Sequence, residues 1–490
     1  MLGHRPRRPA HPPAAVAARN AGRSRRGLLL LLAVAQLMVI LDISAVNVAL
    51  PDLARDLDIG QANLSWTITS YSLIFGSLLL LGGRAADLLG RRRVFLTGLT
   101  VFTVASLVSA LADSATALFV ARGGQGLGAA LLSPAALSII TSTFQGPERA
   151  KALGVWGAVG GAGAAVGVLL GGTLTELVDW RAIFFINLPI GLVLAAAAVK
   201  VLPTDVKRPQ WRGLDLRGAL LATGSLGAFV YAMSQAESAG WTSTQTLGLV
   251  AVAMAGLAGF AALEIRTAQP LLRVERLADR AVGGGFLMML LASGVLFGSF
   301  LLSSLYLQNV LAAGPLETGL AFLPFAVAIA LGVHAAGHVI SHGGVRVPLA
   351  GGFVVTAAGM LLLSGVSSGG SYAADVLPGM LVAGLGLGVV LVSVSVALLT
   401  GAPEQEAGML SGLNTTGHEI GGSLGIAVLV TIATGAVGGT HGPEAAAGLG
   451  DAFLAAGVTA SIAGLLALVI LPSARIFLPK LRLAPRVAVH

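Results

Sequence analysis

The stretch LLLLLAVAQLMVILDISAVNVALP, from Leu28 to Pro51, decides the class of protein to which this chain belongs. It is an almost unbroken apolar run that contains one carboxylate, Asp42. A run of this length crosses the hydrocarbon core of a bilayer as an α-helix. A carboxylate inside a bilayer costs about 2.5–3.5 kcal/mol on insertion scales, so it normally faces a partner or a wet cavity. Asp42 is therefore expected to bind and release a proton or, alternatively, to hydrogen-bond a neighbouring helix.

The composition of the whole chain agrees with a membrane location. Of its 490 residues, 55% are hydrophobic and 11% are charged, and the mean hydropathy is +0.87. A soluble domain carries about 25% charged residues. The 67 glycines favour a tightly packed bundle, because small residues let transmembrane helices approach closely. The absence of cysteine excludes disulfides and thiolate metal sites.

Apolar runs along the chain predict an all-α polytopic membrane protein with fourteen transmembrane helices. Because this number is even, both termini are expected on one side of the membrane. In this topology 27 of the 30 Lys and Arg residues lie on the side of the termini, which the excess of basic residues marks as cytoplasmic. The net charge of +8 therefore reflects topology, and no nucleic-acid partner is expected. The predicted spans are 28–50, 62–81, 94–112, 114–140, 150–173, 182–201, 214–236, 245–264, 282–308, 317–338, 346–366, 373–400, 405–436 and 449–471.

An internal repeat divides the chain into related halves. Gly83-x6-Gly90-Arg91 recurs as Gly337-x6-Gly344-x-Arg346, and the pair Gly126-Leu-Gly128 recurs as Gly384-Leu-Gly386. Related halves around a central site are a transporter architecture. The predicted parts are a disordered cytoplasmic tail (1–26), a six-helix bundle (27–201), two extra helices with linkers (202–280), a second six-helix bundle (281–472) and a cytoplasmic tail (473–490).

Several motifs resemble those of the major facilitator superfamily, specifically its fourteen-span drug:proton antiporter family. The resemblance covers about 27–471. It rests on LDISAVNVALP (41–51), GRAADLLGRRR (83–93), RGGQGLG (122–128), WRAIFFINLPIG (180–191) and YLQ (306–308) with GLAFLP (319–324). It implies the major facilitator fold, with two six-helix bundles and two extra central helices. Two positions depart from the usual pattern: Leu88 replaces a basic residue, and Val168 replaces a proline.

Asp42 and Arg122 are candidates for proton coupling. Each lies eight residues from the predicted outer end of its span, so both sit roughly 12 Å below the outer boundary at about 1.5 Å per residue. A pair at one depth can neutralise each other, and protonation of Asp42 would weaken the pair and let the bundles reorient. The family resemblance also implies a role in proton coupling for both positions. A purely structural role for Arg122 is the alternative.

The loop between spans two and three is a candidate gate. Its residues are Gly83, Asp87, Gly90, Arg91 and Arg92. Asp87 can cap a neighbouring helix N-terminus or pair with Arg91 or Arg92, and such contacts would break when the halves rock. The alternative is that the arginines only anchor the topology.

Small residues also mark one face of the fifth span. Gly163, Gly167 and Gly171 recur every four residues, which permits close helix packing.

Span thirteen carries a polar stripe of Ser411, Thr415, Glu419 and Ser423. The four-residue spacing places these residues on one helix face, which should line the central cavity because lipid exposure would be costly. Glu419 is expected to bind a cationic substrate, to be a second proton site, or to pair with His418 as structure. The predicted substrate cavity comprises Asn47, Gln125, Thr415, His418 and Glu419.

His334, His338 and His342 recur every four residues, a spacing that can ligate a metal. Packing of the repeated loop explains them better, and no metal is expected. Without a Gly-x4-Gly-Lys-Ser/Thr motif, the chain has no P-loop for ATP, so the proton gradient should drive it and no cofactor is expected.

These observations favour a proton-coupled exporter of lipophilic, including cationic, drugs or antibiotics, working as a monomer in a bacterial inner membrane. The nearer alternative is a dedicated exporter of one endogenous metabolite, such as a self-made antibiotic or a siderophore. A membrane-embedded enzyme would need a nucleophile–base pair or a metal cluster, and no such set is convincing. A sensor would need a signalling domain, which the short loops do not offer.

Overall fold

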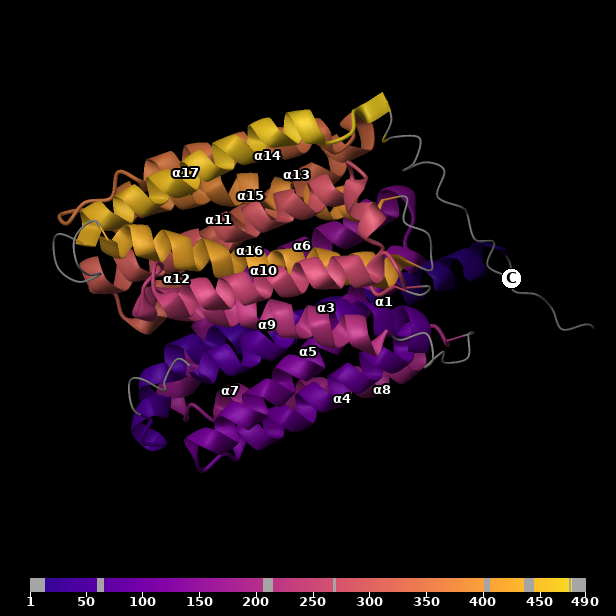
Figure 1. Ribbon diagram of the computed structural model, residues 1–490, viewed down its shortest axis with the longest axis horizontal. Helices are drawn as coiled ribbons and strands as arrows, with labels where there is room; N and C mark the ends of the chain where they lie inside the picture. The colour runs from indigo at the N-terminus through magenta and orange to yellow at the C-terminus, as the bar shows by residue number, and fades with distance from the viewer. Residues whose placement is uncertain are drawn as a thin grey trace, which may run out of the picture.

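The computed structural model describes residues 14–59, 66–205, 215–267, 270–400, 406–435, 445–475 and 477. Within these ranges all regular secondary structure is helical, and twelve helices are long and apolar enough to cross a membrane. The helices run side by side and nearly parallel (Figure 1). The chain is thus a multi-pass all-α membrane protein.

The first half of the chain forms a bundle whose helices pack mainly through α3, α4 and α5 and through α1 and α6. Their bounds are α1 Ala14–Asp56, α3 Trp66–Leu89, α4 Arg91–Ala110, α5 Ala115–Thr143, α6 Gly146–Leu177, α7 Ala182–Phe185 and α8 Asn187–Val201. The predicted sixth span is broken between α7 and α8. Pro189 explains the break, because a proline ring clashes with the carbonyl four residues earlier, here that of Phe185.

The second half repeats this arrangement after a helical hairpin. The hairpin is α9 Leu216–Ala239 and α10 Thr244–Glu264, followed by the short η2 Val274–Ala278. The second bundle contains α11 Val282–Leu305, η3 Tyr306–Val310, α12 Pro315–Ala321, α13 Leu323–Gly343, α14 Arg346–Leu363, η4 Tyr372–Val376, α15 Leu377–Leu399, α16 Ala407–Gly435 and α17 Ala445–Ile470.

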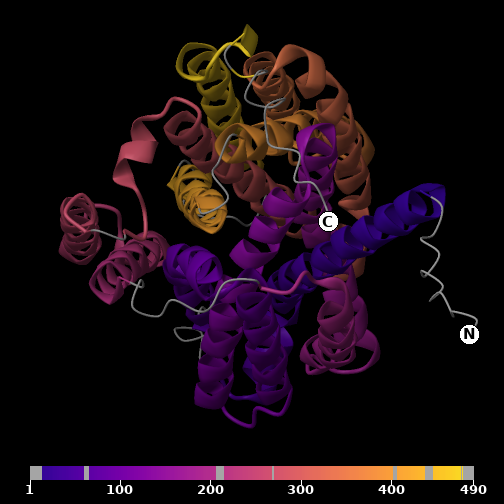
Figure 2. The ribbon, with the colours of Figure 1, turned by 90° about the vertical axis from the view of Figure 1, so that its right-hand side faces the viewer.

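Two seams join the halves: α3 packs against α16, and α6 packs against α13. The α9–α10 hairpin, which separates the two bundles in the sequence, lies on the outside of the fold, where α9 covers α3 and α16 (Figure 2). On α10 most of the apolar stretch is exposed. The hairpin is therefore central in the sequence but peripheral in the fold.

The predicted disordered tail is partly wrong. Helix α1 already begins at Ala14, so the second half of residues 1–26 is helical, and residues 1–13 lie outside the described part. Alanine and arginine have high helix propensity, and extending an existing helix avoids the cost of nucleating a new one. We call the end of the molecule where α1 begins and α17 ends the terminal end, and the opposite one the far end (Figure 1).

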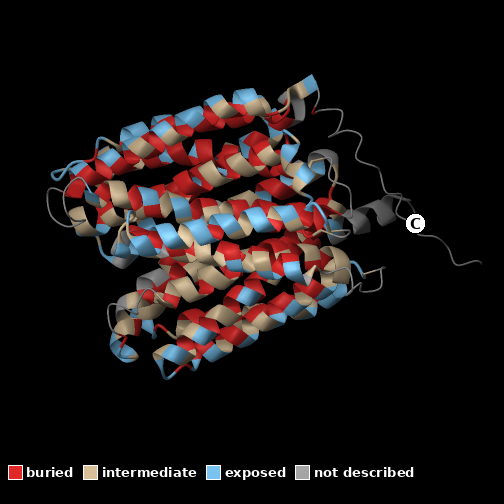
Figure 3. Ribbon diagram, in the orientation of Figure 1, coloured by how far each residue is buried: buried red, intermediate tan, exposed pale blue. Residues whose placement is uncertain are grey.

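Exposed residues lie on the outer faces of the bundle (Figure 3), and many of them are large and apolar. Val120, Leu220 and Val469 are each more than 70% exposed although they lie in long helices. Such faces are suited to lipid, in which the backbone of a helix is satisfied internally. The polar and charged residues discussed below lie inside the bundle or at its two ends.

The glycine stripe of α6 lies against α1. A Cβ at Gly163 would contact Ile40, one at Gly167 would overlap Ser44, and one at Gly171 would overlap the backbone of Ala45. The absence of side chains at these positions lets the two helices approach closely. This approach fixes the register of α1, the helix that carries Asp42.

Candidate functional site

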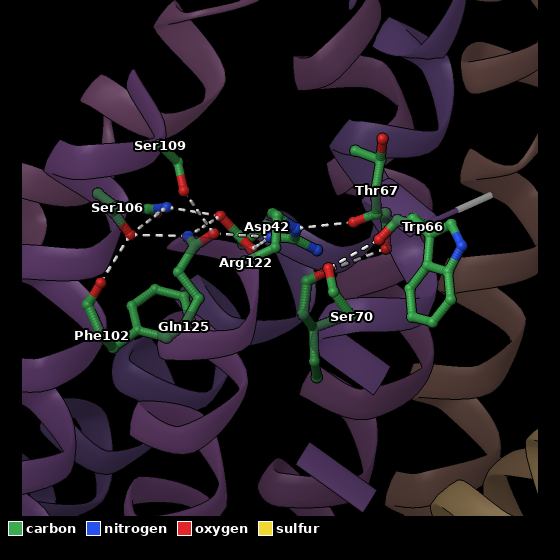
Figure 4. A network of polar contacts seen from close by, with 12 residues as sticks. Asp42, Trp66, Thr67, Ser70, Phe102, Ser106, Ser109, Arg122 and Gln125 are labelled. Carbon is green, nitrogen blue, oxygen red and sulfur yellow. Dashed lines mark hydrogen bonds and ion pairs between the residues drawn. The ribbon is translucent and has the colours of Figure 1, made fainter. Parts of the chain in front are cut away.

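The two residues proposed for proton coupling form a buried ion pair inside the first bundle (Figure 4). Arg122 Nη1 on α5 donates to Asp42 Oδ2 on α1, and both side chains are almost completely buried. The equal depth inferred from the sequence thus corresponds to direct contact in the structure.

Two amides complete the coordination of the Asp42 carboxylate. Gln125 Nε2 donates to Asp42 Oδ1 at 2.8 Å, and Asn187 Nδ2 donates to the same oxygen at 2.9 Å. Ser106 Oγ accepts from both amides, at 2.9 and 3.3 Å. Every neighbour of Asp42 in this network donates a hydrogen bond to one of its carboxylate oxygens.

Asn187 is a functional candidate that the sequence analysis quoted within a motif but did not assign. It begins α8 directly after the break in the sixth span and is buried. A polar amide inside an apolar span was the available signal, because such groups seek partners within the bundle.

The guanidinium of Arg122 has further partners on α3 and α5. Its Nε donates to the carbonyl of Thr67 at 3.1 Å, and Nη1 donates to Gln125 Oε1 at 2.9 Å. Its Cζ lies 4.5 Å from the ring centre of Tyr71 and 5.8 Å from that of Phe184. Removing one partner of a buried ion pair typically costs about 3–5 kcal/mol, because the other charge is left unpaired.

A cavity of about 100 Å³ lies between the two halves and is partly open to solvent. Three helices of each half line it. The lining residues are Gln36, Val39, Ile40, Ile43 and Ser44 of α1, Phe75 of α3, Trp156, Gly157 and Gly160 of α6, Met289 and Phe297 of α11, Leu391 and Ser395 of α15, and Asn414, Thr415, His418 and Glu419 of α16. A mostly apolar and aromatic wall with a few polar groups suits small lipophilic molecules.

The predicted polar stripe of α16 contributes to this wall. Thr415, His418 and Glu419 line the cavity, as the sequence predicted. His418 Nδ1 is 3.4 Å from Glu419 Oε1, and its ring meets Phe297 edge-on at 5.1 Å. Glu419 is the one carboxylate among the lining residues, so a cation bound here would meet a single negative charge.

Asp42 does not share this wall. The residues of α1 that line the cavity lie on one face of the helix, whereas the Asp42 carboxylate points into the first bundle toward α5 and α8. Gln125 was expected in the cavity but lies in the Asp42 network, because its amide is engaged by Asp42 and Arg122. The side chain of Asn47 lies outside the described residues.

Asp87 joins the two halves at the terminal end. Its carboxylate accepts from the backbone N–H groups of Gly408 and Met409, both at 2.9 Å, and so caps the N-terminus of α16. Arg91 Nη2 lies 3.8 Å from the same carboxylate. A Cβ at Gly83 would collide with the carbonyl of Gly408, so glycine is required for this close approach.

Arg92 was expected to act in the gate, but its contacts stay within the first half. Its Nη2 donates to the carbonyl of Val199 at the end of α8, at 2.7 Å. Asp205, just beyond α8, accepts from the backbone N–H of Arg92 at 3.2 Å and of Arg93 at 3.1 Å, and thereby caps α4. Gly90 precedes this cap with a φ of 107°, a conformation that favours glycine.

The linker after α10 also holds the start of α16. Arg273 Nη1 lies 3.0 Å from Glu406 Oε1, and Arg276 Nη2 lies 2.8 Å from Glu406 Oε2. These three residues were not singled out from the sequence, because nothing in it indicated that the linker reaches α16.

The histidines of the repeated loop do not assemble a recognisable metal site. The rings of His334 and His338 are 5.8 Å apart, and the side chain of His342 lies outside the described residues. Within the described part of the chain, no group of three His, Asp or Glu residues could hold a metal ion.

Comparison with known proteins agrees with this architecture. The chain is 42% identical over 428 residues to the puromycin resistance protein pur8 of Streptomyces alboniger, covering 86% of this chain and 84% of that one. It is 37% identical to the cephamycin export protein CmcT of Amycolatopsis lactamdurans, covering 87% and 88% of the two chains. With the tetracenomycin C resistance and export protein of Streptomyces glaucescens the identity is 34%, covering 84% and 76%.

The fold has a counterpart among solved structures. The crystal structure of the human organic anion transporter MFSD10 (TETRAN) superposes with a TM-score of 0.65 at 17% identity, covering 90% of this chain and 99% of that one. The sequence model of the Major Facilitator Superfamily matches residues 32–426. The chain is a membrane transporter rather than an enzyme, and it belongs to the Major Facilitator Superfamily.

Proposed function

We propose that the protein exports lipophilic antibiotics and drugs, cations among them, in exchange for protons. The observation that carries this proposal is the cavity between the halves, which is largely apolar and contains Glu419 as a carboxylate. The antibiotic resistance and export functions named for its relatives support transport out of the cell.

Proton exchange would proceed through the Asp42–Arg122 pair. A proton on Asp42 would neutralise the acceptor of Arg122 and weaken the contact between α1 and α5. One proton yields about 2.3 kcal/mol per 100 mV, and one pH unit adds about 1.36 kcal/mol. The total of about 3.7 kcal/mol supports a substrate gradient on the order of 500-fold, which is sufficient for useful export.

We further propose fourteen spans, as in the drug:proton antiporter family, with both termini in the cytoplasm of a bacterial cell. Helices α6 and α9 would add to the twelve counted by length and hydropathy, since they run beside them and pack against α1 and α3. The basic residues at the terminal end support this orientation. We propose that the transporter works as a monomer in the inner membrane.

A dedicated exporter of one endogenous metabolite is the second candidate. It is supported by the relatives named for export of, or resistance to, a single antibiotic. The two candidates differ in the number of chemically unrelated molecules that the cavity accepts.

The test is transport into energised inverted membrane vesicles. We expect accumulation of several unrelated compounds from a panel that includes ethidium, puromycin and chloramphenicol, and its collapse when an uncoupler is added. Accumulation of one compound class only would favour the dedicated exporter. Accumulation that persists with the uncoupler, or none in vesicles that contain folded protein, would contradict the proposal.

A further inference from the structure

Tyr71 is a buried phenol that the network around Asp42 leaves unused. It lies on α3, one turn after Thr67, and is 1% exposed. Its hydroxyl oxygen has no hydrogen-bond partner among the described residues. A phenylalanine would fill the same space without this loss, as Phe75 and Phe184 do nearby. Because burying an unpaired hydroxyl costs free energy, this oxygen calls for an explanation.

The ring of Tyr71 already contacts the guanidinium of Arg122. Arg122 Cζ lies 4.5 Å from the ring centre, while Arg122 Nε is held by the carbonyl of Thr67 on the same helix. A short slide of the guanidinium along the ring face would bring one of its N–H groups to the hydroxyl at the ring edge. Arg122 thus has a further potential acceptor close to the three that it uses in this structure.

Arg122 needs such an acceptor if Asp42 takes up a proton, a premise that rests on the proposed function. Arginine stays protonated in proteins, and a buried guanidinium without an acceptor is costly. The proton would bind Asp42 Oδ2, the oxygen to which Arg122 Nη1 donates. The other two acceptors of Arg122, the carbonyl of Thr67 and Gln125 Oε1, already accept from Arg122 itself, so the hydrogen bond to Asp42 Oδ2 would be lost without a replacement.

We propose that the hydroxyl of Tyr71 accepts Arg122 when Asp42 is protonated, so that Arg122 alternates between two hydrogen-bonded positions. Tyr71 is then a positioning residue for proton coupling. It undergoes no covalent change: one proton binds Asp42, and one N–H of Arg122 changes its acceptor. A side chain with two discrete arrangements is the kind of element through which coupling is transmitted.

Tyr71 also connects the ion pair with the substrate cavity. Its ring centre is 5.6 Å from that of Phe75, which lines the cavity one turn further along α3. The charged groups that act on Tyr71 are Asp42 on α1, Arg122 on α5 and Glu419 on α16. A movement of Arg122 along this ring would therefore be transmitted through Tyr71 and Phe75 to the cavity wall.

The test is a double-mutant cycle between Tyr71→Phe and Asp42→Asn, in which the asparagine imitates the protonated acid. At pH 8, Tyr71→Phe alone should leave the Tm of the purified transporter unchanged or raise it. In the Asp42→Asn background the same substitution should lower the Tm, because the hydroxyl is then in use. A cycle isolates such an interaction if each substitution adds no new one.

Two control variants separate this proposal from general effects. Tyr306→Phe removes a hydroxyl that donates to the carbonyl of Ser367 at 2.8 Å, so it should lower the Tm equally in both backgrounds. Thr67→Val removes the other buried, unpartnered hydroxyl near Arg122 and should show no dependence on Asp42. An equal effect of Tyr71→Phe in both backgrounds, or coupling at Thr67 instead, would overturn the proposal.

Transport gives a second readout with a defined sign. Without the Tyr71 hydroxyl the protonated state loses an acceptor, so the pH of half-maximal proton-driven export should fall by about one unit, or tenfold in proton affinity. An unchanged midpoint in a Tyr71→Phe variant that still exports would contradict the inference. The Tm cycle requires no transport, so it distinguishes failure of this inference from failure of the proposed function.

Discussion

The two halves share an arrangement of helices but differ in the positions of their charged residues. The repeated Gly-Leu-Gly sequence places Met380 of α15 at the position that Arg122 occupies in α5, and both residues are buried. Helices α11 and α15 contain no charged residue, whereas α1 and α5 supply the Asp42–Arg122 pair. The first half therefore holds the chemistry proposed for coupling, and the second half supplies mainly an apolar surface and Glu419.

The same contrast appears at the repeated turns. Gly90 and Gly344 both have positive φ, at 107° and 69°. A Cβ at Gly83 would collide with α16, however, whereas one at the repeat-equivalent Gly337 would meet nothing within 4 Å. The turn of the first half is thus packed across a seam, and its counterpart is not. The predictions below test this asymmetry, beginning with the largest expected effect.

Replacing the buried carboxylate should have the largest effect on transport. We expect Asp42→Asn to abolish accumulation of substrate against a gradient while the protein still folds and binds substrate, because the amide cannot exchange a proton. The control is Met380→Leu, a volume-conserving swap at the place in the second half that corresponds to Arg122, the partner of Asp42, and it should cost less than about 1.5 kcal/mol. Vesicle transport and thermal unfolding measure both; wild-type uphill transport by Asp42→Asn would exclude the coupling role.

Removing the cavity charge should affect only some substrates. We expect Glu419→Gln to reduce export of the cation ethidium by at least about tenfold, the equivalent of 1.4 kcal/mol, and to spare neutral chloramphenicol. Asn414→Ala, which changes the same wall without a change in charge, serves as the control. Equal loss for both substrates with normal folding would indicate a second proton site, and unchanged transport of both would leave only a structural role.

The close approach of α3 and α16 gives a paired prediction. Gly83→Ala should push the two helices apart. It should thereby destabilise the conformation in which the terminal end is closed by about 1–3 kcal/mol. Gly337→Ala should be neutral or slightly stabilising, since alanine favours a helix by up to about 1 kcal/mol over glycine. Reactivity of single cysteines placed at each end would report the two conformations. Similar responses of the two variants would remove the asymmetry.

Asp87 should have a smaller effect at the same seam. Asp87→Asn keeps one acceptor for the N-terminus of α16 but loses the charge and the second acceptor. Loss of a cap costs typically about 1 kcal/mol, so we expect a roughly fivefold change in the ratio of the two conformations. Substrate affinity within one conformation should not change. Identical cysteine labelling at both ends in the variant and the wild type would refute a gating role.

The sequence predicted most of the architecture because hydrophobic length and the repeat are local signals. The long apolar helices and the pairing of Asp42 with Arg122 followed from span length and depth. The outer position of α9 and α10 did not, because it depends on which faces of α3 and α16 remain free after the bundles pack. No periodicity within the hairpin contains that information.

The candidate site was predictable only in part, for a related reason. A stripe on α16 can be read from spacing, and Thr415 and Glu419 do line the cavity. Whether a polar group on α5 faces the cavity depends on the rotation of the helix in the bundle. No lining residue comes from α5, so Gln125 was misplaced. Asp205 and Glu406 act at loops distant in sequence from their partners, which single-sequence patterns do not reveal.

The smallest expected effect concerns the far end, where the two halves use different groups to hold their loops. In the first half Asp56 accepts from Arg181 at 2.6 Å and from Trp180 Nε1 at 3.1 Å. These hydrogen bonds, that of Arg181 foremost, lower the pKa of the Asp56 carboxyl. In the second half Tyr306 and Tyr372 donate to backbone carbonyls, each at 2.8 Å, and phenols do not titrate in acid.

We therefore expect Asp56→Asn and Tyr306→Phe to respond differently to acid. Because the folded-state pKa of Asp56 is lowered, its contribution to stability is complete above the unfolded-state pKa of about 3.9 and is lost as the pH falls through the folded-state value. The small Tm deficit of Asp56→Asn should therefore be constant above about pH 4 and shrink toward zero as the pH falls below it. That of Tyr306→Phe should stay constant over the same range. A deficit for Asp56→Asn that is independent of pH would mean that Arg181 and Trp180 hold the loop through packing, since Arg181 also lies 4.2 Å over the Trp180 ring.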